Sequence, residues 1–307
     1  MIAPVGSRPD SARPVAWRER SRVVRRWRLW RTRNPRTFNE KVRYKMLRDH
    51  RQLMVTYADK AAVRDHVASV VGTHFLPGLL HVLDDPQALV DATLPTAYVV
   101  KPTHGSGVAI IVSPTADPAA RLPARQHSWA YTHVRPEFAP TEQLAALGES
   151  WMEQLYGQGP NREWVYGHVP RRIIVEEFLV GPDGAVPNDY KLFVFHGTCR
   201  YVQVDRGRFD RRTQDFFTPD WSHLPLSGGN PWATPAIVRP ERLEEMIELA
   251  ERLGGGTDFV RVDLYDLPDR IVFGELSSFP AGGDSPFDPE SFNLEFGRHW
   301  HPPRRYR

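Results

Sequence analysis

The stretch FVRVDLYDLPDRIVFGELSSF, residues 259–279, contains two strand-like apolar runs, and each run is interrupted by one acid. The runs predict two β-strands and the DLPDR segment predicts a turn, so the stretch is expected to form a β-hairpin. Asp263 lies in the first strand and Glu275 in the second, so the hairpin would bring the two carboxylates face to face. Burying two negative charges side by side is unfavourable unless a positive charge lies between them.

Three interpretations account for this acid pair. A hard divalent cation such as Mg²⁺ would neutralise both carboxylates, with the hydroxyl groups of Ser277 and Ser278 nearby, and would leave coordination positions open for phosphate oxygens. Alternatively, Arg261 lies on the same strand face as Asp263 and forms a structural ion pair with one acid. The third interpretation is a pair of catalytic carboxylates of the glycosidase type, although no sugar-specific feature accompanies it.

The composition is that of an ordinary globular protein with one large domain or two modest ones. The chain has 307 residues, of which 41% are hydrophobic and 25% are charged. No apolar run is long enough for a membrane-spanning helix, and the arginine-rich N-terminus does not have the pattern of a secretory signal. The single cysteine, Cys199, excludes an internal disulfide and a cysteine-rich metal site. We therefore expect a cytoplasmic protein.

Positive charge is concentrated at the N-terminus. Residues 1–48 contain 13 Arg and 2 Lys against three acids, a net charge of +12 in a chain whose total is +3. Val23, Trp27 and Trp30 recur at helical spacing, which predicts a basic amphipathic helix over about residues 15–31. Such a helix suits an anionic polymer, or a membrane surface at the inner membrane face. The alternative is a docking helix with buried aromatic side chains and solvated arginines.

The rest of the chain alternates helices with pairs of strands. We expect helices within residues 34–60 and over 59–71, 141–156 and 240–256, hairpins over 96–112, 189–206 and 259–279, and a strand over 171–181. The second hairpin is expected to turn at His196–Gly197, and residues 206–235 are expected to form a loop. The apolar face of the last helix is expected to comprise Met246, Leu249, Ala250 and Leu253. This order favours an α+β fold over a strict βαβ alternation. Neither a Rossmann nor a P-loop motif is present in the sequence.

Three lysines and a glycine-rich turn are candidates for binding phosphate. Lys101 ends a strand just before the turn His104–Gly107, Lys60 begins a helix, and Lys191 lies inside an apolar strand. A lysine beside a turn with accessible backbone N–H groups is suited to a phosphate group. The alternative is that each lysine lies along the surface with its amine in water.

The segment IIVEEFLVG, residues 173–181, is a candidate adenine site. A strand that leaves a sheet has unpaired backbone groups that would bond the edge of the base. Glu176 would accept a hydrogen bond from the exocyclic amine, Leu179 would pack on the ring, and Asp189 would accept from ribose hydroxyls. The alternative is that these acids are solvated strand ends.

Taken in order, six motifs resemble those of the ATP-grasp superfamily. They are ADK (58–60), VVKPTHGSG (99–107), IIVEEFL (173–179), DYKLFVFHG (189–197), RVDLY (261–265) and FGEL (273–276). Within the superfamily, PRTFNEKV, NREWVYGHVPRRIIVEE and DYKLFVFHG resemble the TupA-like group, which is named for teichuronopeptide biosynthesis. The resemblance covers roughly residues 35–297.

The resemblance implies an ATP-grasp fold of class α+β, in which two α+β lobes sandwich ATP. The implied division is a basic helical N-terminal region at residues 1–58, a small lobe with the glycine-rich loop at 59–180, a large lobe with the metal site at 181–297, and a basic tail at 298–307.

The resemblance also implies a role for each candidate residue. The phosphates of ATP would be contacted by Lys60, Lys101, Lys191 and the loop His104, Gly105, Ser106 and Gly107. Adenine would be held by Glu176, Glu177, Phe178 and Leu179, and ribose by Asp189. Mg²⁺ would be held by Asp263, Glu275 and Ser277, and charge on the transferred phosphoryl group would be stabilised by Arg261 with Lys101 and Lys191.

The chain departs from the family pattern at two places. Ser277 stands where the family often has asparagine, which is a better Mg²⁺ ligand than serine. The part before ADK is also shorter than the usual substrate domain of the family, which leaves part of the acceptor site either simplified or supplied by a partner subunit in a homodimer.

The function implied is ATP-dependent ligation of a carboxylate, such as an amino acid or a sugar acid, to an amine, in cell-surface polymer or natural-product biosynthesis. Arg206, Arg211 and Arg212 are candidates for holding the carboxylate, because guanidinium binds carboxylate through two parallel hydrogen bonds; alternatively they are solvated loop charges. Two other functions stay open: a phosphotransferase that uses the same ATP site, and a non-enzymatic protein that binds polyanions through its N-terminal helix.

Overall fold

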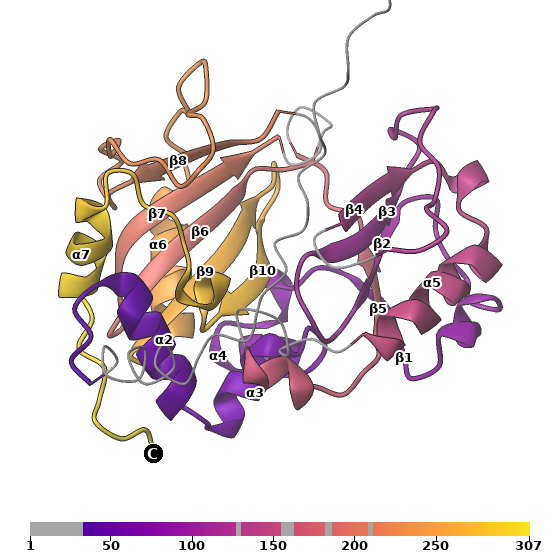
Figure 1. The fold of residues 1–307 in the computed structure, drawn as a ribbon. Helices are drawn as coiled ribbons and strands as arrows, with labels where there is room; N and C mark the ends of the chain where they lie inside the picture. Colours follow the sequence, from indigo (N-terminus) through magenta and orange to yellow (C-terminus); the bar gives the residue numbers. More distant parts are fainter. Residues whose placement is uncertain (1–32, 127–129, 155–162, 182–185, 208–210) are drawn as a thin grey trace, which may run out of the picture.

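The computed structural model describes residues 33–126, 130–154, 163–181, 186–207 and 211–307. The predicted basic helix near residues 15–31 lies outside these ranges. The described strands form two separate five-stranded sheets, with helices packed on both (Figure 1). This arrangement confirms the predicted α+β class.

The first sheet is the smaller lobe. Its strands lie in the order β1 (Leu79–Leu83), β5 (Ile173–Glu177), β2 (Tyr98–Pro102), β3 (Val108–Val112) and β4 (Ala130–Val134). The predicted hairpin over 96–112 is confirmed, since β2 and β3 pair in antiparallel register, while β3 and β4 are parallel. Helix α5 (Thr141–Glu153) buries Leu144, Leu147 and Trp151 in the core of this sheet.

The second sheet contains the hairpin that bears the acid pair. Its strands lie in the order β10 (Ile271–Ser277), β9 (Phe259–Asp266), β6 (Asp189–Phe195), β7 (Thr198–Arg206) and β8 (Thr213–Phe217), and every pair is antiparallel. The predicted turn between β6 and β7 is confirmed. His196 and Gly197 have φ angles of 51° and 76°, the left-handed conformation that tight hairpin turns require.

Strand β8 corrects the prediction of a loop over residues 206–235. Residues 213–217 pair with β7 from Val202 to Arg206. The segment TQDFF is short, begins with three polar residues and follows a stretch rich in arginine, so no apolar–polar alternation marks it as a strand.

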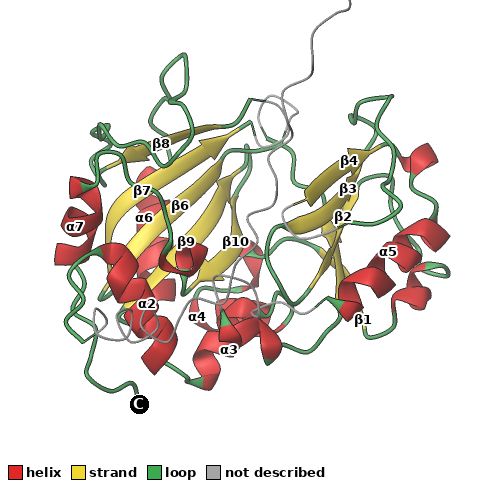
Figure 2. Ribbon diagram, in the orientation of Figure 1, coloured by secondary structure: helices red, strands yellow, loops and turns green. Residues whose placement is uncertain are grey.

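Helices cover both faces of the second sheet (Figure 2). Helices α2 (Phe38–Arg48) and α7 (Ser291–Arg298) lie on one face, where Phe38 contacts Phe193 and Phe259 through T-shaped ring contacts. Helix α6 (Leu243–Gly254) lies on the other face, and a Cβ atom on Gly254 would approach Val194 to 2.5 Å. The predicted apolar face of α6 is confirmed, because its four residues are all buried.

Two short helices, α3 (Gln52–Ala58) and α4 (Ala62–Val70), lie between the sheets (Figure 1). Their buried residues Met54, Val63 and Val67 belong to the core of the second sheet. The lobe boundaries predicted from the sequence stay a prediction. The 3₁₀ turns are η1 (Thr73–Phe75), η2 (Pro86–Leu89), η3 (Pro136–Phe138), η4 (Trp164–Gly167) and η5 (Pro280–Gly283).

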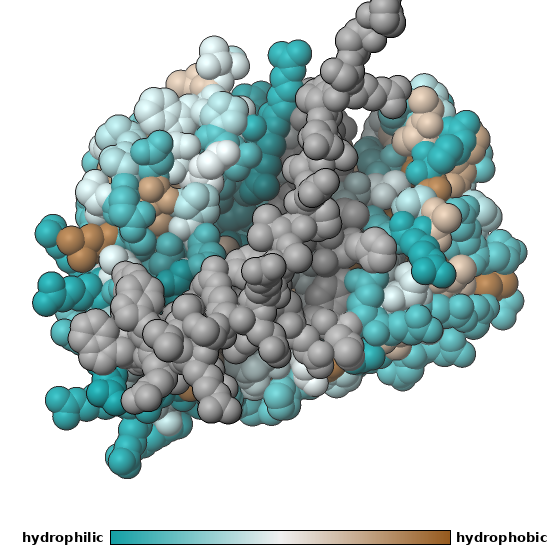
Figure 3. Space-filling view, viewed as in Figure 1, coloured by the Kyte–Doolittle hydropathy of each residue, from teal (hydrophilic) through white to brown (hydrophobic). Residues whose placement is uncertain are grey.

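The described side chains on the face shown in Figure 3 are mainly hydrophilic, and the hydrophobic ones on it are scattered. Among the helices of the described ranges, none combines the length and the apolar character needed to cross a bilayer.

Candidate active site

A pocket lies where the two sheets and the helices between them meet. We call it the cleft pocket. It is lined by Tyr57, Ala58, Lys60, Val63 and Arg64 from α3, α4 and the turn between them, Pro77, Lys101 and Glu176 from the first lobe, Tyr166 from η4, and Phe273, Gly274, Glu275, Leu276 and Ser277 from β10. Residues that are more than 200 positions apart in the sequence therefore share one cavity.

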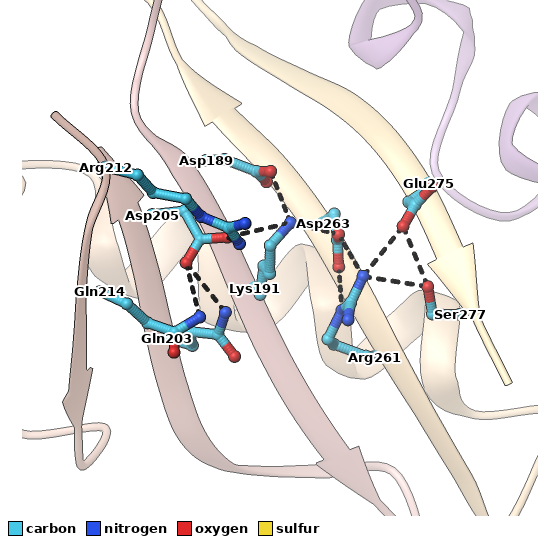
Figure 4. A network of polar contacts seen from close by, with 10 residues as sticks. All are labelled: Asp189, Lys191, Gln203, Asp205, Arg212, Gln214, Arg261, Asp263, Glu275 and Ser277. Atoms are coloured by element: carbon cyan, nitrogen blue, oxygen red, sulfur yellow. Dashed lines mark hydrogen bonds and ion pairs between the residues drawn. The ribbon is translucent and has the colours of Figure 1, made fainter. Parts of the chain in front are cut away.

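One acid of the 259–279 hairpin, Glu275, lines this pocket, and its partner Asp263 is buried. Glu275 and Asp263 are direct partners across β9 and β10, so the sequence correctly predicted that they face each other. Arg261 lies between them (Figure 4): its Nε and Nη2 donate to Asp263 at 2.6 and 2.7 Å, and Nη2 also donates to Glu275 at 2.9 Å. The guanidinium thus pairs with both acids, whereas the structural ion pair expected from the sequence involved only one of them.

The two acids titrate differently because their surroundings differ. Burial raises the pKa of Asp263 to about 6, and the charges of Glu275 and Asp189 act in the same direction, against Arg261 and Lys191. Burial would also raise the pKa of Glu275, but the positive charges around it outweigh burial and lower this pKa to about 2. The pKa values of the two acids are therefore shifted in opposite directions, and Glu275 remains accessible because 45% of its side chain is exposed.

A row of polar side chains extends from the acid pair across the second sheet (Figure 4). Lys191 on β6 donates to Asp263 at 2.7 Å and also pairs with Asp189, and all three side chains are buried. Further along the row, Asp205 accepts hydrogen bonds from Gln203, Gln214 and Arg212.

This row is unusual because carboxylates and positively charged side chains lie next to one another on a buried face of the sheet. Such a face is stable only when every charge has a partner. We call it the polar row; it comprises Asp189, Lys191, Gln203, Asp205, Arg212, Gln214, Arg261, Asp263, Glu275 and Ser277.

The other two predicted lysines reach the cleft pocket from its opposite side. Lys60 Nζ donates to the carbonyl oxygen of Gly105 at 2.6 Å, and Lys101 pairs with Glu176. Burial and the positive charge of Lys101 lower the pKa of Lys60 to about 8. Gly105 and Gly107 have φ angles of 87° and 74°, a conformation that glycine adopts readily. The structure therefore brings both lysines and the glycine-rich turn to one place.

The candidate adenine segment begins at this pocket. Glu176 is buried and pairs with both Lys101 and Arg64. The backbone N–H of Glu177 donates to Gly78 at 2.9 Å, and its carboxylate pairs with Arg270. Phe178 lies beside His133, with ring centroids 5.7 Å apart. Leu179, a half-buried residue just beyond β5, does not line the pocket.

Three further predicted residues, His104, Arg206 and Arg211, do not line the cleft pocket. His104 is buried beside α5, where its Nε2 lies 3.1 Å from the carbonyl oxygen of Trp151, and burial lowers its pKa to about 4. Arg206 is exposed at the end of β7, and Arg211 is exposed just before β8.

Sequence reasoning did not assign three residues of this site. Arg64 follows Lys60 by four residues and bonds Glu176 at 2.9 Å. Tyr166 lines the pocket and bonds Ser106 of the glycine-rich turn. Burial and the charge of Glu275 raise the pKa of Glu163, a partner of Tyr166, to about 7. Glu163 and Tyr166 both lie in the motif NREWVYGHV, whose resemblance to the TupA-like group is the sequence signal for them.

A family model matches residues 40–301, most of the chain, and its description is TupA-like ATP-grasp. The chain belongs to the TupA-like ATP-grasp family. No curated protein is detectably similar to it in sequence.

Solved structures of ATP-grasp proteins are distant from the chain. An L-amino acid ligase from Bacillus licheniformis is 14% identical with a TM-score of 0.41; the match covers 75% of this chain and 45% of that one. A D-alanine–D-alanine ligase from Bacillus anthracis complexed with ATP is 13% identical with a TM-score of 0.39, and the match covers 74% of this chain and 57% of the ligase. The ATP-grasp ligase PsnB complexed with a precursor variant, Mg and ADP is 12% identical with a TM-score of 0.35, and the match covers 74% of this chain and 51% of PsnB. The matches thus span about half the length of these chains.

The residues of the cleft pocket fit the Mg²⁺ and ATP that an ATP-grasp family implies. Mg²⁺ is usually held by one or two carboxylates together with phosphate oxygens, rather than by a cage of protein ligands. Asp263 and Glu275 supply such a pair. In the described ranges, no group of three or more His, Cys, Asp or Glu side chains is arranged to hold a metal, so phosphate oxygens and water would complete the coordination.

Proposed function

We propose that the chain is an ADP-forming carboxylate–amine ligase. The observation that carries the proposal is the convergence, in one cleft between two sheets, of Lys60 and Lys101 from one side with Glu275 and its partner Arg261 from the other. Separately, each of these residues has an ordinary structural explanation. Together they make a site in which positive groups surround a carboxylate pair, as a bound metal–triphosphate requires.

In this proposal the chain's residues bind ATP and orient it. Lys60, Lys101 and Lys191 attract the phosphates, and the glycine-rich turn offers backbone N–H groups to them. Glu176 and the backbone of residues 177–179 bind adenine, and Asp189 binds ribose. Asp263 and Glu275, with the hydroxyl of Ser277, would hold Mg²⁺, which would supply Lewis-acid stabilisation of phosphate charge.

The reaction would take place in two steps. An oxygen of the carboxylate substrate attacks the γ-phosphorus of ATP, the bond to the β-phosphate oxygen breaks, and an acyl phosphate and ADP form. The amine then attacks the acyl carbon and phosphate leaves, which forms the amide. Arg261 and Lys191 stabilise the charge that develops on the transferred group, and closure of the cleft excludes water.

The carboxylate substrate would be held at the exposed end of the polar row. Arg212 is half-exposed, and Asp205 fixes one edge of its guanidinium through a 2.8 Å hydrogen bond. A guanidinium held in this way offers its remaining N–H groups to a substrate carboxylate with little loss of side-chain entropy. Arg206 and Arg211 are further candidates. We propose amino acids or sugar acids as the substrate class.

Other expectations stay predictions. Binding of an anionic polymer or a membrane surface by the basic N-terminal helix concerns residues outside the described ranges. A role in cell-surface polymer or natural-product biosynthesis, cytoplasmic location, the homodimer and the exact lobe boundaries also stay predictions.

The decisive experiment combines two readouts. The protein is incubated with ATP, Mg²⁺, a panel of amino acids and sugar acids, and an amine donor, while ADP release and product mass are measured together. We expect ADP, phosphate and a dehydrated conjugate in equal amounts, and we expect Lys101→Met to abolish all three. Phosphate retained on the product would show the alternative phosphotransferase activity instead. Formation of AMP and pyrophosphate would refute the ligase.

A further inference from the structure

A second cavity lies on the opposite face of the second sheet from the polar row. Along β8, Gln214 bonds Asp205 in the polar row, and alternate residues of a strand point to opposite faces. Asp215 and Phe217 therefore point away from the polar row. They line a cavity of about 360 Å³ together with Trp221, His223, Trp232 and Ile237. We call it the aromatic pocket.

The rings of the aromatic pocket form a connected wall. Phe217 and Trp221 are stacked with centroids 4.1 Å apart and ring planes 4° from parallel. His223 packs edge-on against Phe217 at 5.2 Å and against Trp232 at 5.0 Å. Four rings from three segments thus line one space whose volume is in the range of small-molecule sites.

The polar atoms of this wall are fixed by contacts within the protein. The indole N–H of Trp232 donates to the carbonyl of Leu226 at 3.1 Å. Asp215 accepts from the Nε2–H of His223 at 2.9 Å and from the backbone N–H of Ala233 at 2.9 Å. These bonds hold the rings in place and leave few polar groups to bind a ligand through hydrogen bonds.

Two features distinguish this pocket from aromatic packing in a hydrophobic core. Trp232 is 47% exposed, and 38% of the His223 side chain is exposed, so large apolar rings face water around a hollow. Trp221 has a φ angle of 69°, which is unfavourable for a bulky residue. Backbone conformations of this kind occur preferentially at ligand sites.

The chemistry of the pocket selects among ligands. A sugar needs several hydrogen-bond partners for its hydroxyl groups, and the wall offers few. A quaternary or methylated ammonium group needs none, because it is attracted to the faces of aromatic rings and to a nearby negative charge. Asp215, which lines the pocket and whose side chain is only 4% exposed, supplies that charge.

We propose that the aromatic pocket binds an alkylammonium group about the size of choline. The site is independent of the proposed ligase activity, because it lies on the other face of the sheet from the cleft pocket. Its occupancy can be measured without ATP, so the failure of one proposal leaves the other standing.

The test is calorimetric titration of the full chain with choline, with its neutral isostere 3,3-dimethylbutan-1-ol, and with a methyl glucoside. We expect saturable binding of choline and at least roughly tenfold weaker binding of the neutral isostere, since only the charge differs. Equal binding of choline and the isostere, tighter binding of the glucoside, or no saturable choline binding would each overturn the proposal.

Variants locate the site. Trp232→Ala should weaken choline binding roughly five- to thirtyfold, the range expected for loss of one cation–π contact. Trp232→Phe, which keeps a ring, should retain most of the affinity and guards against misfolding of the alanine variant. Val238→Ala is the matched control, because Val238 lies in the same segment, is 83% exposed and does not line the pocket. Unchanged choline affinity in Trp232→Ala would overturn the assignment.

Discussion

Replacement of Lys60 by methionine is expected to stabilise the ligand-free protein while abolishing ATP turnover. The pKa of Lys60 falls from 10.5 to about 8, chiefly because of burial and then because of the charge of Lys101. At about 1.4 kcal/mol per unit, the buried charge disfavours folding at neutral pH by at most about 3 kcal/mol. The half-buried position of Lys60 reduces this figure, and loss of the bond to Gly105 offsets about 1 kcal/mol. We expect a net gain of about 1–2 kcal/mol.

The pH dependence of this gain follows from the direction of the shift. The pKa of Lys60 is lower in the folded than in the unfolded state, so the folded wild type binds fewer protons between about pH 8 and 10.5. The stability of the wild type therefore rises across that window, whereas the methionine variant lacks this contribution. The difference between the two proteins should be largest below pH 8 and should shrink toward pH 10.

Urea denaturation of both proteins at pH 7, 8, 9 and 10 measures this difference, and Lys60→Arg serves as a control that keeps the charge. ADP release measured on the same preparations should be lost in the methionine variant. A methionine variant that is less stable than the wild type at pH 7, or a gain that does not change with pH, would show that the reasoning about burial is wrong.

Three further predictions concern charge and packing. Glu275→Gln should lower kcat/KM by about 100-fold. It should change the free energy of unfolding by less than about 1 kcal/mol, because the Glu275 side chain is 45% exposed. ADP release and urea denaturation measure the two effects, and a large loss of stability would contradict the assignment. Lys45→Ala should destabilise by about 3–5 kcal/mol in urea denaturation, because Lys45 is fully buried and its removal leaves the buried carboxylate of Asp49, 3.0 Å away, with less compensation. Gly297→Ala should destabilise the protein by about 1–3 kcal/mol and lower Tm, because a Cβ atom at Gly297 would lie 2.2 Å from a backbone oxygen. Gly167→Ala is the control: a Cβ atom there would have no atom within 4 Å, so Tm should be nearly unchanged.

The hairpin and its acid pair could be predicted because both signals are local. A period of two residues, a short turn and one acid in each strand were enough to place Asp263 opposite Glu275, as the register shows. The position of Arg261 on the same face followed from the same periodicity. Its pairing with both acids did not, because that depends on how the guanidinium lies across two strands.

Other parts of the site depend on contacts that the sequence does not display. Arg64 lies on an amphipathic helix, where an arginine is normally solvated, yet here it meets Glu176 from a strand 112 residues away. His104 lies in a glycine-rich turn and looked like a ligand residue, but its ring packs against α5. Strand β8 is short and has no apolar–polar alternation, so it becomes a strand only through its pairing with β7.

The pairing of Arg261 with both carboxylates has a consequence for how the protein is made and handled. In a protein whose acidic site is neutralised only by its metal, a chelator removes the force that holds the acids together, and folding then depends on metal supply. Here the counter-charge is built into the chain, at 2.6 Å from Asp263 and 2.9 Å from Glu275. We therefore expect the polypeptide to fold in the presence of EDTA and to load its cation together with the nucleotide, so that synthesis of the protein and its activation are separate events.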